Sequence, residues 1–192
     1  MHLISEHLRL RNPRFVCRDN QQGTFIVPLR SEVGAPPSRA ELRQLKSLSG
    51  SEFSALARFY SDFDGARFHV HGHTEGLCVA SICSLEALNG EWREVVATMA
   101  EFSKPYPFQV SGVAFATIAA SGNYFVMYKG RVYYSDHDGG DDAIWGQDLD
   151  DFFRRALSDP ARFLFEAGCY TRYRDGHSST QWIPEQFLHD EP

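Results

Sequence analysis

Three histidines alternate with other residues at positions 69, 71 and 73, in the sequence HVHGH. Side chains two residues apart in a β-strand project from one face, so neighbouring imidazoles would lie about 7 Å apart. Such a series could template a metal ion, but zinc sites usually join at least three converging ligands at helical or Cys-x-x-Cys spacing. We therefore predict no metal site and expect an exposed strand face or a loop near a turn. His69, His71 and His73 are the candidate ligands should a metal bind.

The triplet Asp136-His137-Asp138 has the residue types of an acid–base pair, in which a carboxylate orients a histidine general base. Such a site also needs a nucleophile, and Ser121 lies in Ala-Ser-Gly-Asn rather than in a G-x-S-x-G elbow. Asp and His side chains also satisfy backbone donors in loops at the end of a sheet. We therefore predict a structural loop and no catalytic residue. A hydrolase built on this loop is the less favoured alternative.

Seven carboxylates fall within sixteen residues around this triplet: Asp136, Asp138, Asp141, Asp142, Asp148, Asp150 and Asp151. The last three fit a helix start, where acidic side chains interact favourably with the helix dipole, and the others fit a loop. The run lacks the D-x-[DN]-x-[DN]-G pattern of a calcium loop. It can also form an acidic surface for a basic partner, and the two interpretations are compatible. The candidate binding residues are Asp136, Asp138, Asp141 and Asp142.

Aromatic and arginine side chains gather near the C-terminus, at Tyr170, Arg172, Tyr173, Arg174 and Trp182. Exposed Tyr, Trp and Arg dominate the binding energy of many interfaces. The same side chains could instead attach the tail to a sheet, and both alternatives stay open. Tyr170, Arg172, Tyr173 and Trp182 are therefore further candidate binding residues. The sequence contains no G-x-x-x-x-G-K-[ST] phosphate loop, and no cofactor is predicted.

The amino-acid composition indicates which class of molecule this protein binds. The 192 residues carry a formal net charge of −6, so the basic footprint of a nucleic-acid-binding protein is absent. Neither an apolar run of membrane-spanning length nor the apolar segment of a signal peptide is present. The four cysteines show no Cys-x-x-Cys spacing, which favours reduced thiols. We expect a cytoplasmic protein whose partner is another protein, and we leave its oligomeric state open.

The elements that position these residues follow from hydrophobic periodicity. Helices are predicted from a cap at Ser38, over about 52–62, from Ser84 or Asn89 to the prolines at 105 and 107, and from about Asp148 to Leu157. The stripe Trp92, Val95, Val96, Met99 and Phe102 should pack on the core. Strands are predicted over 24–27, 66–70 and 76–83.

Three further strands, over 113–119, 124–128 and 131–135, are separated by the turn-like sequences Ser-Gly-Asn and Lys-Gly. Short connections of this kind predict an antiparallel meander within about 112–136. Tyr133 and Tyr134 should then point to opposite faces. The order of helices and strands predicts an α+β fold with a central antiparallel sheet flanked by helices.

Several segments in this order resemble the SUKH superfamily, which includes the fungal Smi/Knr cell-wall regulators. They are Leu56-x-x-Phe59-Tyr60-x-x-Phe63-Asp64-Gly65, Gly122-Asn123-Tyr124-Phe125-Val126, Gly130-Arg131-Val132-Tyr133-Tyr134-x-Asp136-His137-Asp138, and the helix with Asp151-Phe152-Phe153. The resemblance spans residues 40–167. It implies the same α+β fold and a function by protein binding, because many bacterial members look like immunity proteins that neutralise a toxin.

We therefore expect a non-enzymatic immunity protein that binds a polymorphic toxin with a basic surface. A regulatory or adaptor scaffold, like the fungal relatives, is the alternative. The chain is divided into an N-terminal arm (1–37), an α+β domain (38–167) and a C-terminal extension packed on the domain (168–192). The two terminal segments extend beyond the resemblance, which leaves the identity of the partner open.

Overall fold

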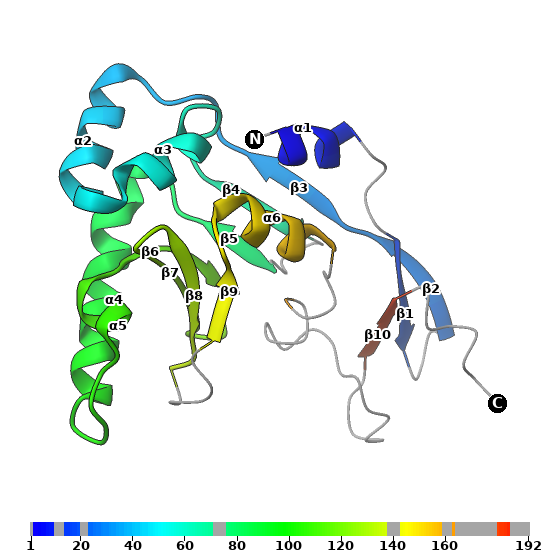
Figure 1. The fold of residues 1–192 in the computed structure, drawn as a ribbon. Coiled ribbons are helices and arrows are strands. Elements are labelled where there is room, and N and C mark those ends of the chain that lie inside the picture. The colour runs from blue at the N-terminus through cyan, green and yellow to red at the C-terminus, as the bar shows by residue number, and fades with distance from the viewer. Residues whose placement is uncertain are drawn as a thin grey trace.

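The computed structural model describes residues 2–9, 14–19, 23–70, 76–137, 143–158, 163 and 180–184. A seven-stranded antiparallel sheet contains, in spatial order, β3 (Arg30–Val33), β4 (Ala66–Val70), β5 (Leu77–Val79), β6 (Val113–Ile118), β7 (Tyr124–Tyr128), β8 (Arg131–Ser135) and β9 (Ala143–Gly146). A smaller sheet contains β10 (Thr180–Pro184), β1 (Arg14–Asp19) and β2 (Gly23–Pro28). Figure 1 shows both sheets, joined through β2 and β3.

Helices pack on both sides of the larger sheet, as Figure 1 shows. They are α1 (His2–Arg9), α2 (Arg39–Ser49), α3 (Phe53–Tyr60), α4 (Leu85–Met99), α5 (Pro107–Ser111) and α6 (Leu149–Ser158). This arrangement confirms the predicted α+β fold with a central antiparallel sheet flanked by helices. None of the described helices is long and apolar enough to cross a bilayer.

The cross-strand register divides the side chains of the larger sheet between two faces, because residues directly opposite each other share a face. The first face carries a row of partners that is almost entirely apolar: Val33, Ala66, Val79, Ala116, Phe125 and Tyr134. It encloses the main core together with α1, α2, α3 and α6. Phe125 and Phe152 meet there with ring centroids 4.9 Å apart.

The second face carries two rows. The first row consists of Ala114, Val126, Tyr133 and Ile144. The second crosses the sheet from β3 to β8 and is mostly polar: Glu32, Arg67, Cys78, Thr117, Tyr124 and Ser135. Trp92 of α4 and Phe108 of α5 pack here in a separate, smaller core. Tyr133 and Tyr134 therefore lie on opposite faces, as predicted.

Local sequence signals account for two helices. Ser38 Oγ accepts the Glu41 N–H (3.3 Å) and Glu41 Oε2 accepts the Ser38 N–H (2.6 Å), which closes the capping box of α2. Asp148 Oδ1 accepts the Asp151 N–H at 2.8 Å and so caps α6. One stripe of α6 is buried at Leu149, Phe152, Phe153 and Ala156, as its periodicity predicts.

The prediction for the end of α4 was wrong. The helix begins at Leu85, directly after Ser84, but ends at Met99, well before the prolines. Phe102, predicted as part of the buried stripe, is 85% exposed. Pro107 instead begins α5, where its fixed φ suits the first helical position. The chain turns between α4 and α5 so that Phe108 can reach the sheet, and this tertiary contact overrides the periodicity.

The predicted strand over 76–83 is shorter, because β5 ends at Val79 and a 3₁₀ turn follows at Ile82–Ser84. Asp64 Oδ1 accepts the Ile82 N–H at 2.7 Å and holds this turn. Strand β9 was not predicted at all.

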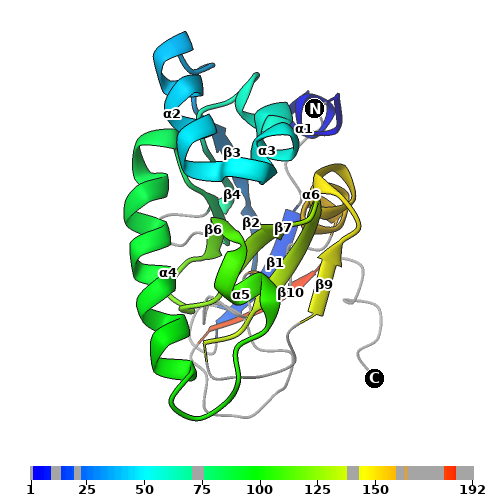
Figure 2. The ribbon, with the colours of Figure 1, turned by 60° about the vertical axis from the view of Figure 1, so that its left-hand side comes forward.

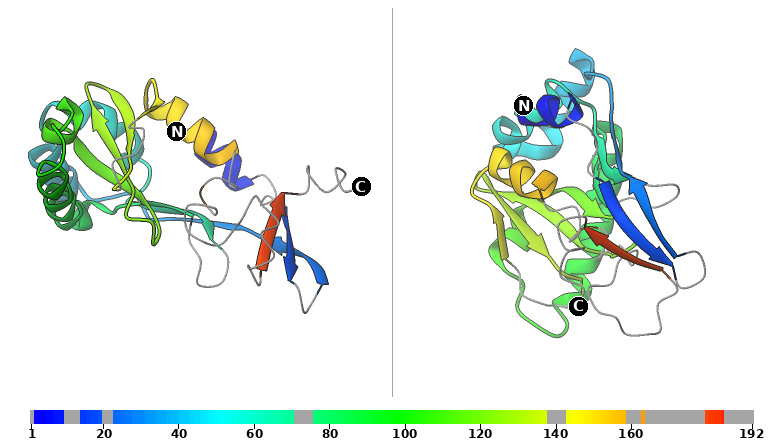
Figure 3. Two further views of the ribbon diagram at one scale, coloured as in Figure 1. Left: turned by 90° about the horizontal axis from the view of Figure 1, so that it is seen from below. Right: turned by 90° about the vertical axis from the view of Figure 1, so that its right-hand side faces the viewer.

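The sheet also extends across the predicted boundary at residue 38. Strand β3 pairs with β4, and Ile4 of α1 is buried in the main core. The small sheet joins the two ends of the chain, since β1 pairs with both β2 and β10. Figure 3 shows this small sheet at the end of the molecule opposite α4.

Candidate functional site

His69, the first of the alternating histidines, is fully buried rather than on an exposed strand face. Its Nε2 lies 2.8 Å from the Ala156 carbonyl oxygen of α6, and its ring packs 5.7 Å from Phe163. Because a carbonyl only accepts, Nε2 carries the proton of this hydrogen bond. His71 and His73 lie outside the described residues. In the described part of the chain, no group of three His, Cys, Asp or Glu is arranged to hold a metal ion.

The loop after β8 is organised by Asn123, which is buried. Its Oδ1 accepts the His137 backbone N–H at 3.1 Å and lies 2.9 Å from His137 Nδ1, and its Nδ2 donates to the Tyr134 hydroxyl at 2.7 Å. Gly122 has a φ of +73°, and a Cβ there would lie 3.2 Å from the His137 ring. These contacts fix the imidazole against the β6–β7 turn.

The same loop does not assemble a nucleophile with its base among the residues that are described. Asp136 Oδ1 is 3.7 Å from His137 Nδ1, beyond hydrogen-bond distance. Ser121 Oγ donates to the Ile118 carbonyl at 2.9 Å and accepts the Asn123 N–H at 3.0 Å, so its proton is directed at the backbone. The geometry favours a structural loop. Asp138 lies outside the described residues.

The remaining carboxylates of the acidic run that can be placed support α6. Asp150 pairs with Arg58 of α3 at 2.6 Å, and Asp151 pairs with Arg154 at 2.9 Å. The Gln147 backbone N–H, together with Arg155 and Arg154, lowers the pKa of the Asp151 carboxyl from its ordinary value. The helix-start interpretation therefore accounts for these positions.

The other predicted binding residues lie near the C-terminus or in the acidic loop. Asp141, Asp142, Tyr170, Arg172 and Tyr173 lie outside the described residues. The backbone of Trp182 belongs to β10, where it pairs with Cys17 of β1. Part of the C-terminal extension is therefore joined to the N-terminal arm by strand pairing.

Two hollows lie at the β3–β4–β5 end of the larger sheet. Helix α4 packs on β6, and the smaller of the two hollows lies beside this helix. The larger, of about 350 Å³, is lined by Glu32, Val33, Gly34, Asp64, Gly65, Ala66, Arg67, Val79 and Ser81. The smaller, of about 210 Å³, is lined by Cys78, Ala80, Ser84, Ala87, Leu88, Glu91 and Thr117.

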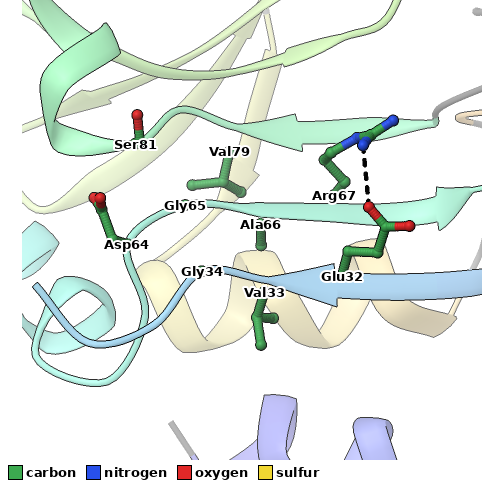
Figure 4. Close-up of a pocket in the computed structure, with 9 residues that line it drawn as sticks. All are labelled: Glu32, Val33, Gly34, Asp64, Gly65, Ala66, Arg67, Val79 and Ser81. Carbon is green, nitrogen blue, oxygen red and sulfur yellow. Dashed lines mark hydrogen bonds and ion pairs between the residues drawn. The ribbon is translucent and has the colours of Figure 1, made fainter.

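Lining residues of the two hollows are neighbours, and we call the two hollows together the open cleft. Arg67 of the larger is the cross-strand partner of Cys78 in the smaller, and Ser81 Oγ lies 2.9 Å from Ser84 Oγ. Figure 4 shows the larger hollow, with Glu32 and Arg67 directed to one side of the strands and Val33 to the other. The Glu32–Arg67 ion pair is 3.0 Å long, and both side chains are 44% exposed.

The lining of the open cleft is acidic. It contains the three carboxylates Glu32, Asp64 and Glu91 against the single guanidinium of Arg67. Asp64 is held in place by its bond to the Ile82 N–H. A lining of this sign attracts a cationic group and disfavours an anionic one.

Chemistry in the cleft would need an activated group, and Cys78 does not qualify as one. Burial raises the pKa of the Cys78 thiol, and nearby Arg67 only partly opposes this effect. The thiol therefore stays protonated at neutral pH, whereas nucleophilic cysteines have a lowered pKa.

Hydrophobic periodicity did not predict this site, because its residues come from separate strands. Glu32, Arg67 and Cys78 are neighbours only through the β3–β4–β5 register. The sole signal in the sequence is that each sits at a polar position within a strand. Comparison with family models, with curated proteins and with solved structures found no match for the chain.

Proposed function

We propose that the chain is a non-enzymatic immunity-type protein, which neutralises a bacterial toxin by binding a basic part of it in the open cleft. The observation that carries the proposal is the acidic lining of a hollowed sheet face. The SUKH resemblance supports the same class. The proposal places the protein in the cytoplasm, where its cysteines stay reduced.

The mechanism is steric and electrostatic. A Lys or Arg side chain of the toxin enters the smaller hollow beside Glu91, while its apolar stem packs on Ala87 and Leu88. Complementary charge speeds association, and the bulk of the complex covers the toxin's active site. No bond is made or broken in this process.

The test uses a polymorphic toxin encoded by the reading frame next to this gene. We expect the wild-type chain to bind it in calorimetry and to restore growth of cells that express it. Glu91→Lys, which reverses a charge in the cleft, should weaken binding by about tenfold or more. Glu101→Lys is the matched control, because Glu101 is exposed and does not line the cleft.

Equal binding and rescue by both variants would refute the cleft as the binding site. Failure of the wild-type chain to rescue would refute the immunity role for that toxin. Co-purification with a host enzyme, lost on Glu91→Lys, would instead support the regulatory scaffold.

Alkylation provides an independent readout of the same site. At alkaline pH, where part of the Cys78 thiol ionises, bound toxin should slow the alkylation of Cys78, because this residue lines the cleft. Equal alkylation of Cys78 with and without toxin would contradict the proposed location.

A further inference from the structure

Four aromatic rings from α5, β7, β8 and the residue before α5 lie in contact on the second face. Tyr106 stacks on Phe108 with centroids 5.9 Å apart and planes at 12°, and Phe108 stacks on Tyr133 at 4.6 Å and 9°. Tyr128 meets Tyr133 edge to face at 6.2 Å. Phe108 is buried, whereas Tyr106 is 56% exposed. The outer ring of a rigid stack therefore faces solvent.

Exposed aliphatic side chains border this stack. Val110 is 69% exposed and lies one helical turn after Tyr106, since its N–H bonds to the Tyr106 carbonyl. Ile144 is 41% exposed and is the cross-strand partner of Tyr133 on β9, the last strand of the sheet. We call the exposed Tyr106, Val110 and Ile144, together with the half-buried Tyr128 and Tyr133, the aromatic surface. Clustered exposed apolar side chains of this kind mark interaction sites.

The rim of the aromatic surface carries two exposed cations, although the protein as a whole is acidic, and the carboxylate that bonds to this turn, Glu52, is buried. Lys129 Nζ lies 5.1 Å from the centroid of the Tyr128 ring. Arg131 is the cross-strand partner of Tyr128, and it shares a face of β8 with Tyr133. Neither cation forms an ion pair with any carboxylate of the described ranges.

We infer that the aromatic surface binds a partner protein through a segment that presents apolar side chains beside carboxylates. Stacked rings that are already packed lose little conformational freedom on binding, which suits an anchor site. Lys129 and Arg131 then supply complementary charge at the rim. A basic toxin would be repelled here, so this surface and the open cleft select partners of opposite charge.

The two surfaces lie at opposite ends of the sheet. The open cleft includes β3, at one edge, and the aromatic surface includes β9, at the other. Figure 2 shows α5 in front of the strands toward the β9 end. The inference therefore does not depend on the proposed toxin binding, and one protein can hold both partners.

A display selection with random short segments tests the inference on the full-length protein. Enriched segments should combine Leu, Phe or Trp with Asp or Glu. Synthetic peptides of these sequences should bind about tenfold or more weakly to the double variant Lys129→Glu/Arg131→Glu and to Tyr106→Ala. Glu91→Lys, in the open cleft, should leave their affinity unchanged. Circular dichroism melts verify that each variant is folded.

Several results would overturn the inference. These are the absence of any enriched segment, enrichment of basic segments, or peptides that bind all variants equally. Two further experiments test other ligands of the same surface. A poly-dT oligonucleotide tests for nucleic-acid binding, and sedimentation analysis of the protein alone tests for self-association. Binding of poly-dT, or self-association, that is abolished by Lys129→Glu/Arg131→Glu would assign the surface to nucleic acid or to a second copy.

Discussion

At the residue scale, the buried carboxylate of Glu52 has a defined structural task. It accepts the N–H groups of Lys129 (2.8 Å) and Gly130 (3.0 Å) in the turn between β7 and β8. Both turn residues have positive φ, +51° and +73°, which a two-residue hairpin turn of type I′ requires. Glu52 thus ties the end of the 3₁₀ turn η1 (Gly50–Glu52) to a hairpin far away in the sequence, and it stabilises the positive φ of Lys129.

Replacing Glu52 by Ala should lower the free energy of unfolding by about 1–3 kcal/mol, because two part-buried backbone donors lose a charged acceptor. Glu52→Gln keeps one acceptor and should cost less. Urea unfolding at neutral pH measures both. The exposed Glu101→Ala serves as control and should change stability by less than about 0.5 kcal/mol. Equal midpoints for Glu52→Ala and the wild type would contradict this role.

The lowered pKa of the Asp151 carboxyl predicts that the stability of the protein depends on pH. Its pKa is lowered in the folded state, mainly by the Gln147 N–H, so the unfolded chain binds the proton more readily. The carboxylate therefore contributes stability above its ordinary pKa of 3.8, and this contribution is lost as the pH falls through the lower folded value. Wild type should exceed Asp151→Asn in stability at pH 7, and the difference should vanish in strong acid.

Thermal melts between pH 2 and 7 would measure this difference. Asp62→Asn, which removes an exposed carboxylate that makes no side-chain hydrogen bond in the described structure, is the control. A difference between wild type and Asp151→Asn that grows toward low pH would show that the sign is wrong.

At the element scale, two glycines near α4 and α5 differ in the space available for a Cβ atom. A Cβ at Gly112 would lie 2.3 Å from Val126 Cγ1 and 2.4 Å from the Phe108 carbonyl oxygen. A Cβ at Gly90, inside α4, would meet nothing within 4 Å. Close contact of α5 with β7 requires the first glycine, whereas nothing in the packing of α4 requires the second.

Gly112→Ala should therefore lower the free energy of unfolding by about 1–3 kcal/mol, the usual cost of overpacking. Gly90→Ala should raise it by about 0.5–1 kcal/mol, because alanine loses less backbone freedom in a helix. Urea midpoints of the two variants would be compared with that of the wild type. Shifts in the same direction for both would contradict the packing described for α5.

At the scale of the whole molecule, the N-terminal segment belongs to the main fold. Ile4 and Leu29 are fully buried, and β3 forms an edge of the larger sheet. A chain limited to residues 38–167 lacks all three. Its predicted independence as a domain is therefore open to a direct test.

We expect the 38–167 fragment to melt about 10 °C or more below the 1–167 fragment, because two buried side chains and a strand are lost. The 1–167 fragment is the matched control, since both lack the C-terminal extension. Calorimetry would measure the two transitions. Coincident melts would show that the first 37 residues contribute nothing to the main core.

Much of the fold could be predicted because its signals are local. The capping box at Ser38, the stripe of α6 and the strand pattern of β6, β7 and β8 each depend on a few neighbouring residues. Phe102 shows where this fails. Its spacing fits the α4 stripe, yet the helix ends at Met99 and the side chain faces solvent. Helix ends and short edge strands such as β9 depend on distant partners, which periodicity does not contain.

The sequence alone determined the fold class, the meander and the helix caps, because propensity, patterning and capping act between residues close in the chain. Only the tertiary structure decided which side chains share a surface. The open cleft joins β3, β4, β5 and α4, and the aromatic surface joins the Tyr106 segment to β7, β8 and β9. Strand register and helix placement set these neighbours, and a shift of one residue would send each side chain to the opposite face.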